Sequence, residues 1–152
     1  MTQSSLPFAG DDSASRVDEL TLYCDGGSRG NPGPAAIGAV VFDATKDPPE
    51  RVAIVSERIG VTTNNVAEYR ALIAALEAVA RFHARVIHVR ADSMLMIKQL
   101  RGEYRVKHAN LRPLHVAAKA LLAEYEIVDR QHVPREENVD ADALVNAALD
   151  AS

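Results

Sequence analysis

Four acidic residues along the chain are of the type that binds divalent cations: Asp25, Glu68, Asp92 and Asp142. Each one stands at the beginning or end of a different predicted helix or strand. Four carboxylates that are brought together repel one another, so a fold that gathers them needs divalent cations to hold the site. Carboxylate sites that hold two metal ions cleave phosphodiester bonds. These residues therefore make a nuclease the leading hypothesis.

Each acid also has a purely structural interpretation. Asp25 precedes two glycines and could bond its own backbone in a turn. Glu68 follows Asn65, a candidate helix N-cap, by three residues, which is the spacing of a capping box. Asp92 could be an N-cap, and Asp142 could complement the dipole of the last helix. The joint pattern favours the metal site, because independent caps have no reason to share one edge of a sheet.

The elements that position these acids follow from the spacing of apolar residues. Three strand patterns joined by short turns predict an antiparallel meander. A helical pattern, a buried strand, two helices, a last strand and a final helix come next. The predicted strands are 20–24, 35–42, 51–59, 86–89 and 126–133, and the predicted helices are 65–83, a short one after 93, 110–125 and 137 to the C-terminus. The order βββαβααβα predicts an α/β fold, a mixed sheet with helices on its faces.

Composition limits the class of protein. The 152 residues have a one-domain length, and 47% hydrophobic with 25% charged residues is typical of a soluble globular protein. Residues 1–18 lack apolar periodicity, so we expect a flexible leader followed by one domain at 19–152. We find neither a run of eighteen apolar residues nor a secretory signal, and a single cysteine, Cys24, fits a reducing cytoplasm without membrane association.

The net charge of −4 at first argues against nucleic acid as a partner. The distribution of charge modifies that view, because residues 101–119 hold five Lys or Arg against one acid. Tyr104, His108 and His115 are interleaved with these cations. The segment is either a solvated helix face or a modest nucleic-acid contact.

Four ordered segments resemble the type I ribonuclease H family over residues 20–149. They are Asp-Gly-Gly-Ser-Arg-Gly-Asn-Pro-Gly-Pro from Asp25, Thr-Asn-Asn-Val-Ala-Glu ending at Glu68, Ala-Asp-Ser around Asp92, and His-Val-Pro-Arg-Glu-Glu-Asn from His132 leading to Ala-Asp-Ala-Leu around Asp142. The resemblance implies a ribonuclease H-like, three-layer fold with a five-stranded mixed sheet and helices on both faces.

The resemblance also implies an activity. Members of the family hydrolyse the RNA strand of RNA/DNA hybrids with two Mg2+ or Mn2+ ions, giving 5'-phosphate and 3'-hydroxyl ends. Asp25, Glu68, Asp92 and Asp142 match the metal-binding tetrad, with Asp25 expected to bridge both ions. Asp140 competes with Asp142 for the fourth place, but the Ala-Asp-x-Leu context favours Asp142.

Further site residues are implied by the same resemblance. His132 or Arg135 is expected to assist proton transfer and product release, and the two are ranked equally. The 2'-hydroxyl distinguishes RNA from DNA, and Glu68 resembles the family residue that contacts it. The expected substrate-binding residues are Gly26, Gly27, Ser28, Arg29, Gly30, Asn31, Asn64, Asn65 and Ser93.

Two departures from the family pattern keep alternatives open. Met94 stands where many members carry a polar residue, and the long basic protrusion of some bacterial members is absent. The alternatives are the same fold acting on double-stranded RNA, and a non-catalytic module that binds hybrids. We expect a monomer, and a fusion to a further domain stays open.

Overall fold

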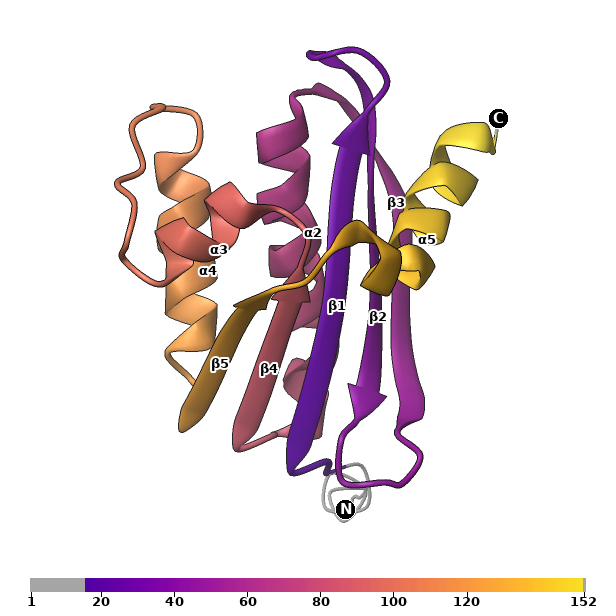
Figure 1. Ribbon diagram of the computed structural model, residues 1–152, viewed down its shortest axis with the longest axis vertical. Coiled ribbons are helices and arrows are strands. Elements are labelled where there is room, and N and C mark those ends of the chain that lie inside the picture. The colour runs from indigo at the N-terminus through magenta and orange to yellow at the C-terminus, as the bar shows by residue number, and fades with distance from the viewer. Residues whose placement is uncertain (1–15, 152) are drawn as a thin grey trace, which may run out of the picture.

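The computed structural model describes residues 16–151, and its elements follow the predicted order (Figure 1). The strands are β1 (Glu19–Ser28), β2 (Gly33–Asp43), β3 (Glu50–Thr62), β4 (Val86–Ala91) and β5 (Ile127–His132). The α-helices are α2 (Asn64–Val79), α3 (Met94–Leu100), α4 (Arg112–Leu122) and α5 (Val139–Asp150). Two 3-10 turns, η1 (Ala80–Phe82) and η2 (Arg135–Glu137), follow α2 and precede α5.

The strands form one sheet with β1 at its centre, in the order β3-β2-β1-β4-β5. β1, β2 and β3 pair antiparallel, whereas β4 lies parallel to β1 and β5 lies parallel to β4. The predicted meander and the predicted mixed sheet are therefore confirmed. Helices α2 and α4 cover one face and α5 covers the other, which gives the three expected layers (Figure 1).

The main core lies between the sheet and α2. Alternate residues of β1, namely Leu20, Leu22 and Cys24, are completely buried, as the period of two in a strand requires when one face packs against a helix. Leu72 and Leu76 of α2 lie four residues apart on the facing side of the helix and are equally buried. A smaller cluster fixes α5 on the opposite face, and its members are Ala36, Val145 and Ala148.

Two glycines let the helices approach the sheet closely. A Cβ added at Gly26 of β1 would overlap the backbone carbonyl of Ala67 in α2. A Cβ added at Gly38 of β2 would overlap the carbonyl of Ala141 in α5 and lie 2.9 Å from the backbone nitrogen of Val145. Both helices that carry candidate site acids therefore depend on a missing side chain in the sheet.

Several boundaries differ from those predicted. The helix was expected to run to residue 83, but α2 ends at Val79 and η1 follows. His83 has a left-handed backbone conformation with φ of 51°, which a right-handed helix cannot include. The helix expected from residue 110 starts at Arg112, with a proline in its first turn. The last helix starts at Val139 instead of residue 137, because η2 occupies the preceding residues.

Most of the expected flexible leader, residues 1–15, lies outside the described residues. The structure corrects the leader's end, because two of its last residues join the domain. The Val17 N–H donates to the carbonyl of Phe82, and the Asp18 carbonyl accepts hydrogen bonds from the N–H groups of Arg85 and Val86. The hydrophobic side chain of Val17 also packs against the main core.

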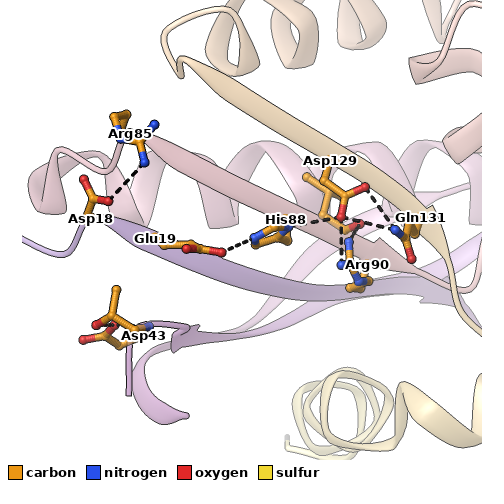
Figure 2. Close-up of polar contacts among 10 residues, drawn as sticks. Asp18, Glu19, Asp43, Arg85, His88, Arg90, Asp129 and Gln131 are labelled. Carbon is orange, nitrogen blue, oxygen red and sulfur yellow. Dashed lines mark hydrogen bonds and ion pairs between the residues drawn. The ribbon is translucent and has the colours of Figure 1, made fainter. Parts of the chain in front are cut away.

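A polar network joins β1, β4 and β5 on the sheet (Figure 2). The His88 ring lies between two carboxylates, with Nε2 2.5 Å from Glu19 and Nδ1 3.1 Å from Asp129. Arg90 also donates to Asp129 at 2.9 Å. Burial alone would raise the pKa of Asp129, but these hydrogen bonds outweigh it and hold the pKa below its usual value. Side chains from three strands are thereby linked.

Across residues 16–151, none of the helices combines the length and the apolar character that crossing a membrane requires.

Candidate active site

Asp25 was predicted to follow the end of the first strand. It lies instead inside β1, three residues before the strand ends. The reason is that β2 continues to pair with β1 as far as Ser28. On the other side, β4 stops at Ala91, opposite Cys24. Asp25 is thus the first β1 residue that has lost one of its two neighbouring strands, which leaves space there for side chains from other elements. Its side chain is nevertheless buried, with 8% of the residue exposed.

Glu68 reaches this position from α2. The N-cap of the helix is Thr63, whose side chain accepts a hydrogen bond from the N–H of Val66, so the predicted cap at Asn65 is wrong. The capping-box interpretation of Glu68 fails with it. The carboxylate of Glu68 accepts instead a hydrogen bond from the backbone N–H of Gly26 at 3.0 Å. This bond fixes Glu68 beside Asp25.

Asp92 follows the last residue of β4 and precedes α3. The N-cap of α3 is Ser93, whose hydroxyl accepts a hydrogen bond from the N–H of Met96 at 3.2 Å. Asp92 is therefore free of the capping role. Its side chain is 9% exposed, and the guanidinium Nε of Arg135 lies 3.6 Å from its Oδ2.

Asp142 comes from the first turn of α5. Its backbone N–H donates to the carbonyl of Asn138, the residue before the helix. One turn later, the Asn146 amide donates to the carbonyl of Asp142 at 3.2 Å and lies 3.4 Å from its carboxylate. The rival candidate, Asp140, is exposed and lines a different cavity beside Tyr23, so the geometry favours Asp142.

All four acids line one cavity of about 380 Å3 at the end of β1. Asp25, Glu68 and Asp92 each offer a carboxylate oxygen, and these three oxygens lie within 4.8 Å of one another. Asp142 lines the same cavity and lies close enough to Asp25 to raise its pKa. The other lining residues are Gly26, Gly27, Ser28, Arg29, Asn64, Arg135, Val145, Asn146 and Leu149.

The electrostatics of the cavity oppose four free negative charges. Burial, then the charge of Asp92, then a hydrogen bond with Asp142 raise the pKa of Asp25 from 3.8 to about 7. Burial and the charges of Asp25 and Asp92 also raise the pKa of Glu68 well above its usual value. The hydrogen bond from the N–H of Gly26 lowers the pKa of both acids, but by less than burial and the neighbouring charges raise it. Near neutral pH the cavity therefore attracts protons or cations.

The donor set suits a hard divalent cation. Carboxylate oxygens are the ligands that Mg2+, Ca2+ and Mn2+ prefer, and the lining includes neither the imidazole nor the thiol ligands typical of zinc. The oxygens of Asp25, Glu68 and Asp92 are close enough to share one ion. The arrangement is consistent with divalent metal binding.

The expected substrate-binding residues fall into two groups. Gly26, Gly27, Ser28, Arg29 and Asn64 line the cavity. The remaining four are not part of its lining: Gly30, Asn31, Asn65 and Ser93.

Asn31 still contributes to the shape of the loop. Its side-chain oxygen accepts the N–H of Asn64 at 3.0 Å. The side-chain oxygen of Asn64 in turn accepts the N–H of Ser28 at 2.9 Å. These two bonds tie the glycine-rich loop to the start of α2, so the two asparagines organise one edge of the cavity.

Arg29 has a partner that the sequence did not indicate. Its guanidinium lies 2.8 Å from the carboxylate of Asp150 and 3.5 Å from the amide oxygen of Asn146. Both partners belong to the last turns of α5. The loop after Asp25 and the end of α5 are thereby joined across the cavity.

The structure distinguishes the two candidates for the assisting residue. Arg135 lines the cavity and lies beside Asp92, with 83% of its side chain exposed. His132 is the last residue of β5, is exposed, and is not among the lining residues. The geometry thus brings Arg135 to the acids and leaves His132 outside the cavity.

Sequence reasoning missed part of the α5 contribution. Val145, Asn146 and Leu149 line the cavity together with Asp142. The signal was present for one of them, since Asn146 follows Asp142 by four residues and must share its side of a helix. The tie from Arg29 to Asp150 spans most of the chain, and no local pattern indicates it.

Comparison with known proteins identifies relatives of the chain. The sequence profile of the reverse transcriptase-like family matches residues 23–148. The chain is 48% identical over 135 residues to ribonuclease HI of Halobacterium salinarum, which covers 89% of this chain and 66% of that protein. It is 44% identical over 134 residues to the bifunctional protein Rv2228c of Mycobacterium tuberculosis, which covers 88% of this chain and 36% of that protein. The chain thus spans about one to two thirds of the length of these curated relatives.

Solved structures give the same answer for the fold. RNase H1 from Halobacterium salinarum matches with a TM-score of 0.83 at 46% identity, over 88% of this chain and 99% of that one. LC11-RNase H1, solved in complex with an RNA/DNA hybrid, matches with a TM-score of 0.80 at 41% identity, over 86% of this chain and 96% of that one. By sequence, by fold and by the acids gathered at the end of β1, the chain belongs to the type I ribonuclease H family.

Proposed function

We propose that the chain is an endonuclease that hydrolyses the RNA strand of RNA/DNA hybrids with divalent metal ions, leaving 5'-phosphate and 3'-hydroxyl ends. The observation that carries the proposal is the single cavity lined by Asp25, Glu68, Asp92 and Asp142. A related protein of 41% identity binds an RNA/DNA hybrid with the same fold.

The four acids have separate roles in this proposal. Asp25, Glu68 and Asp92 would hold one Mg2+ or Mn2+ ion, and Asp25 and Asp142 would hold a second. Bound divalent ions activate the attacking water and stabilise the leaving oxygen in phosphodiester hydrolysis. The burial of Asp25 keeps this carboxylate fixed between the acids of α2 and α5. The Gly26 N–H holds Glu68 in place, so that its second oxygen is available to the site.

Selectivity for RNA has to come from the 2'-hydroxyl, which both donates and accepts hydrogen bonds. Glu68 is the acid we propose for this contact. The loop from Gly26 to Arg29 and Asn64 line the same cavity and would contact the backbone of the hybrid. The loop-to-helix bonds made by Asn31 support this loop from outside the cavity.

We propose Arg135 as the assisting residue. It lies 3.6 Å from Asp92 and is exposed enough to move with the substrate or product phosphate. His132 remains the second candidate, on the ground of the family resemblance alone. We further propose that the chain is cytoplasmic and acts as a monomer. Size-exclusion chromatography with light scattering tests the oligomeric state.

Two alternatives use the same fold. Met94 is 48% exposed at the start of α3, next to Ser93, where a polar residue could have contacted a base. That substitution leaves double-stranded RNA open as a substrate. The second alternative is a module that binds hybrids without cutting them.

One cleavage experiment tests the proposal. A single labelled sequence is presented as RNA/DNA hybrid, RNA/RNA, DNA/DNA and single-stranded RNA, with Mg2+, Mn2+ or EDTA. We expect metal-dependent cleavage of the RNA strand of the hybrid alone, and we expect Asp92→Asn to lose cleavage while it retains binding. The exposed acid Asp140 gives the matched control, because Asp140→Asn should cleave like the wild type.

The other outcomes are equally informative. Hybrid binding without cleavage by the wild type would favour the binding module. Cleavage of RNA/RNA would move the function to a broader ribonuclease. In the same assay Arg135→Ala should lower turnover more than His132→Ala, and the reverse order would assign the assisting role to His132.

A further inference from the structure

Asn138 is the most deeply buried polar residue near the acid cavity, with 1% of its surface exposed. It lies immediately before α5. Its side-chain amide donates a hydrogen bond of 3.0 Å to the backbone carbonyl of Cys24, which precedes Asp25 in β1. The bond joins two residues that are 114 positions apart in the chain.

Both ends of this bond are adjacent to site acids. On β1, Cys24 is the last residue that pairs with β4, so Asp25 follows at the point where that pairing ends. On α5, the backbone carbonyl of Asn138 accepts the N–H of Asp142 at 3.1 Å. One residue therefore links the backbone next to Asp25 to the helical turn that presents Asp142.

The side chain of Asn138 is not explained by helix capping. Asn at this position usually accepts a hydrogen bond from a backbone N–H of the first turn. Asn138 makes no such bond. Its side-chain oxygen is buried and has no hydrogen-bond partner among residues 16–151. A buried acceptor without a partner destabilises a protein, so the donor half of the amide must have a use that offsets this loss.

We propose that Asn138 is a positioning residue for the metal site, which sets the separation between the carboxylates of Asp25 and Asp142. This inference rests on the proposed function, because it assigns Asn138 to the pair of acids that holds the second ion. Outer groups that orient metal ligands typically change metal affinity by about 10- to 100-fold when they are removed. Without the amide donor, the start of α5 loses its bond to β1, and we expect the separation of the two carboxylates to change so that they hold the ion less tightly.

The test compares two variants of Asn138 with a matched control. Asn138→Leu keeps the number and branching of the side-chain heavy atoms and has no donor, and Asn138→Ala loses the whole amide. Ser56→Ala is the control, because the Ser56 hydroxyl also tethers α5, through a 2.8 Å bond to the carbonyl of Leu144, but from β3 and outside the cavity lining. For the wild type and each variant of the 152-residue chain, the rise of Tm with Mn2+ and the Mn2+ dependence of hybrid cleavage are measured.

We expect the Mn2+ concentration at half-effect to rise at least about tenfold in both Asn138 variants. At saturating Mn2+, kcat should recover and KM for the hybrid should stay at the wild-type value. Ser56→Ala should lose some thermal stability and keep the wild-type Mn2+ midpoint. A merely structural role predicts lower Tm values for all three variants without a change in the Mn2+ midpoint.

A folded Asn138 variant with the wild-type midpoint would overturn the inference, and so would an equal shift in Ser56→Ala. If Asn138→Ala fails to fold, Asn138→Leu decides the question, because its side chain has the same branched shape. The thermal measurement needs no catalysis. A wild type that binds Mn2+ but cuts no hybrid would therefore defeat the proposed function while still testing Asn138.

Discussion

At the scale of single residues, the site combines burial with like charge at Asp25. Buried carboxylates favour the neutral form, and neighbouring carboxylates favour it further. These effects raise the pKa of Asp25 to about 7 and that of Glu68 well above its usual value. An acid that holds its proton more tightly in the folded state than in the unfolded state makes folding stability depend on pH. The site therefore has a consequence that is measurable without substrate.

We expect the metal-free protein to lose stability as pH rises from about 4 to about 7. The contribution of Asp25 is fully present below its unfolded pKa of 3.8 and is lost as pH rises through its folded pKa of about 7. One proton corresponds to a slope of at most about 1.4 kcal/mol per pH unit. Urea unfolding in EDTA at about pH 5.5 and about pH 8 measures the difference.

Variants assign this slope to the site. Asp25→Asn should make the dependence shallower, and Glu68 should account for what remains. Asp140→Asn, the exposed acid on α5, should leave the slope unchanged. Mn2+ should stabilise the wild type more at about pH 8 than at about pH 5.5, because ions compete with the protons bound by the acids. An identical slope in Asp25→Asn and wild type would contradict the account.

At the scale of elements, the acids are held by how closely two helices approach the sheet. Gly26 and Gly38 have no side chain at the contacts with α2 and α5 respectively. These contacts bring Glu68 and Asp142 to opposite sides of β1. The close contacts at Gly26 and Gly38 therefore help to set the positions of Glu68 and Asp142.

We expect Gly38→Ala to destabilise the protein and to displace Asp142. The added methyl would overlap the carbonyl of Ala141, so α5 has to move. Overpacking of this kind costs about 1 to 3 kcal/mol, which for a chain of this size lowers Tm by roughly 3 to 10 °C. Calorimetry measures the stability, and the Mn2+ dependence of Tm reports on Asp142.

Gly27→Ala is the matched control for this change. Its added Cβ would meet the side chains of Asn64 and Val145 at 3.8 and 3.9 Å, which are ordinary contact distances. Its stability should stay within about 0.5 kcal/mol of the wild type. Equal losses of Tm in the two variants would show that the close contact between α5 and Gly38 does not cause the loss of stability.

Elements also mark the limit of what the sequence could predict. Alternation and helical spacing were enough for the order of elements and for the meander, because both are local patterns. The end of β1 was missed, since Gly26 and Gly27 indicate a turn, while pairing with β2 keeps them in the strand. The cap of α2 was misplaced at Asn65, because Thr63 is an equally good capping residue and tertiary packing decides between them.

In the candidate site, too, local patterns were predictable from the sequence and long-range contacts were not. The four acids were found because each stands near a predicted boundary and matches a family segment. The hydrogen bond from Gly26 to Glu68 and that from Asn138 to Cys24 join segments that are 42 and 114 positions apart. No periodicity in the sequence reports such contacts, so the supporting residues became visible only in the folded chain.

At the scale of the whole molecule, the proposed function requires a chain of negative net charge to bind a polyanion. The net charge is −4, and the cavity itself is lined by four acids. The loop between α3 and α4 carries positive charge and forms a groove of about 410 Å3 with α3, lined in part by Arg105, Lys107 and His108. Asp92 lies just before α3, whose seven residues correspond to about 10 Å. The loop therefore begins roughly 10 Å beyond Ser93, the residue that follows Asp92.

We expect hybrid binding to depend steeply on salt through this loop. Each phosphate contact contributes about −0.9 to the slope of log K against log salt for a duplex, so Lys107→Ala should reduce the magnitude of that slope by about 0.9. Lys46→Ala changes the same charge in the turn after β2, at the end of the sheet opposite the acids (Figure 1), and should leave the slope unchanged. Binding is measured with Asp92→Asn and a labelled hybrid across a salt series. Equal slopes for the two lysine variants would mean that net charge alone steers the hybrid, and the loop between α3 and α4 would then have no specific part in holding it.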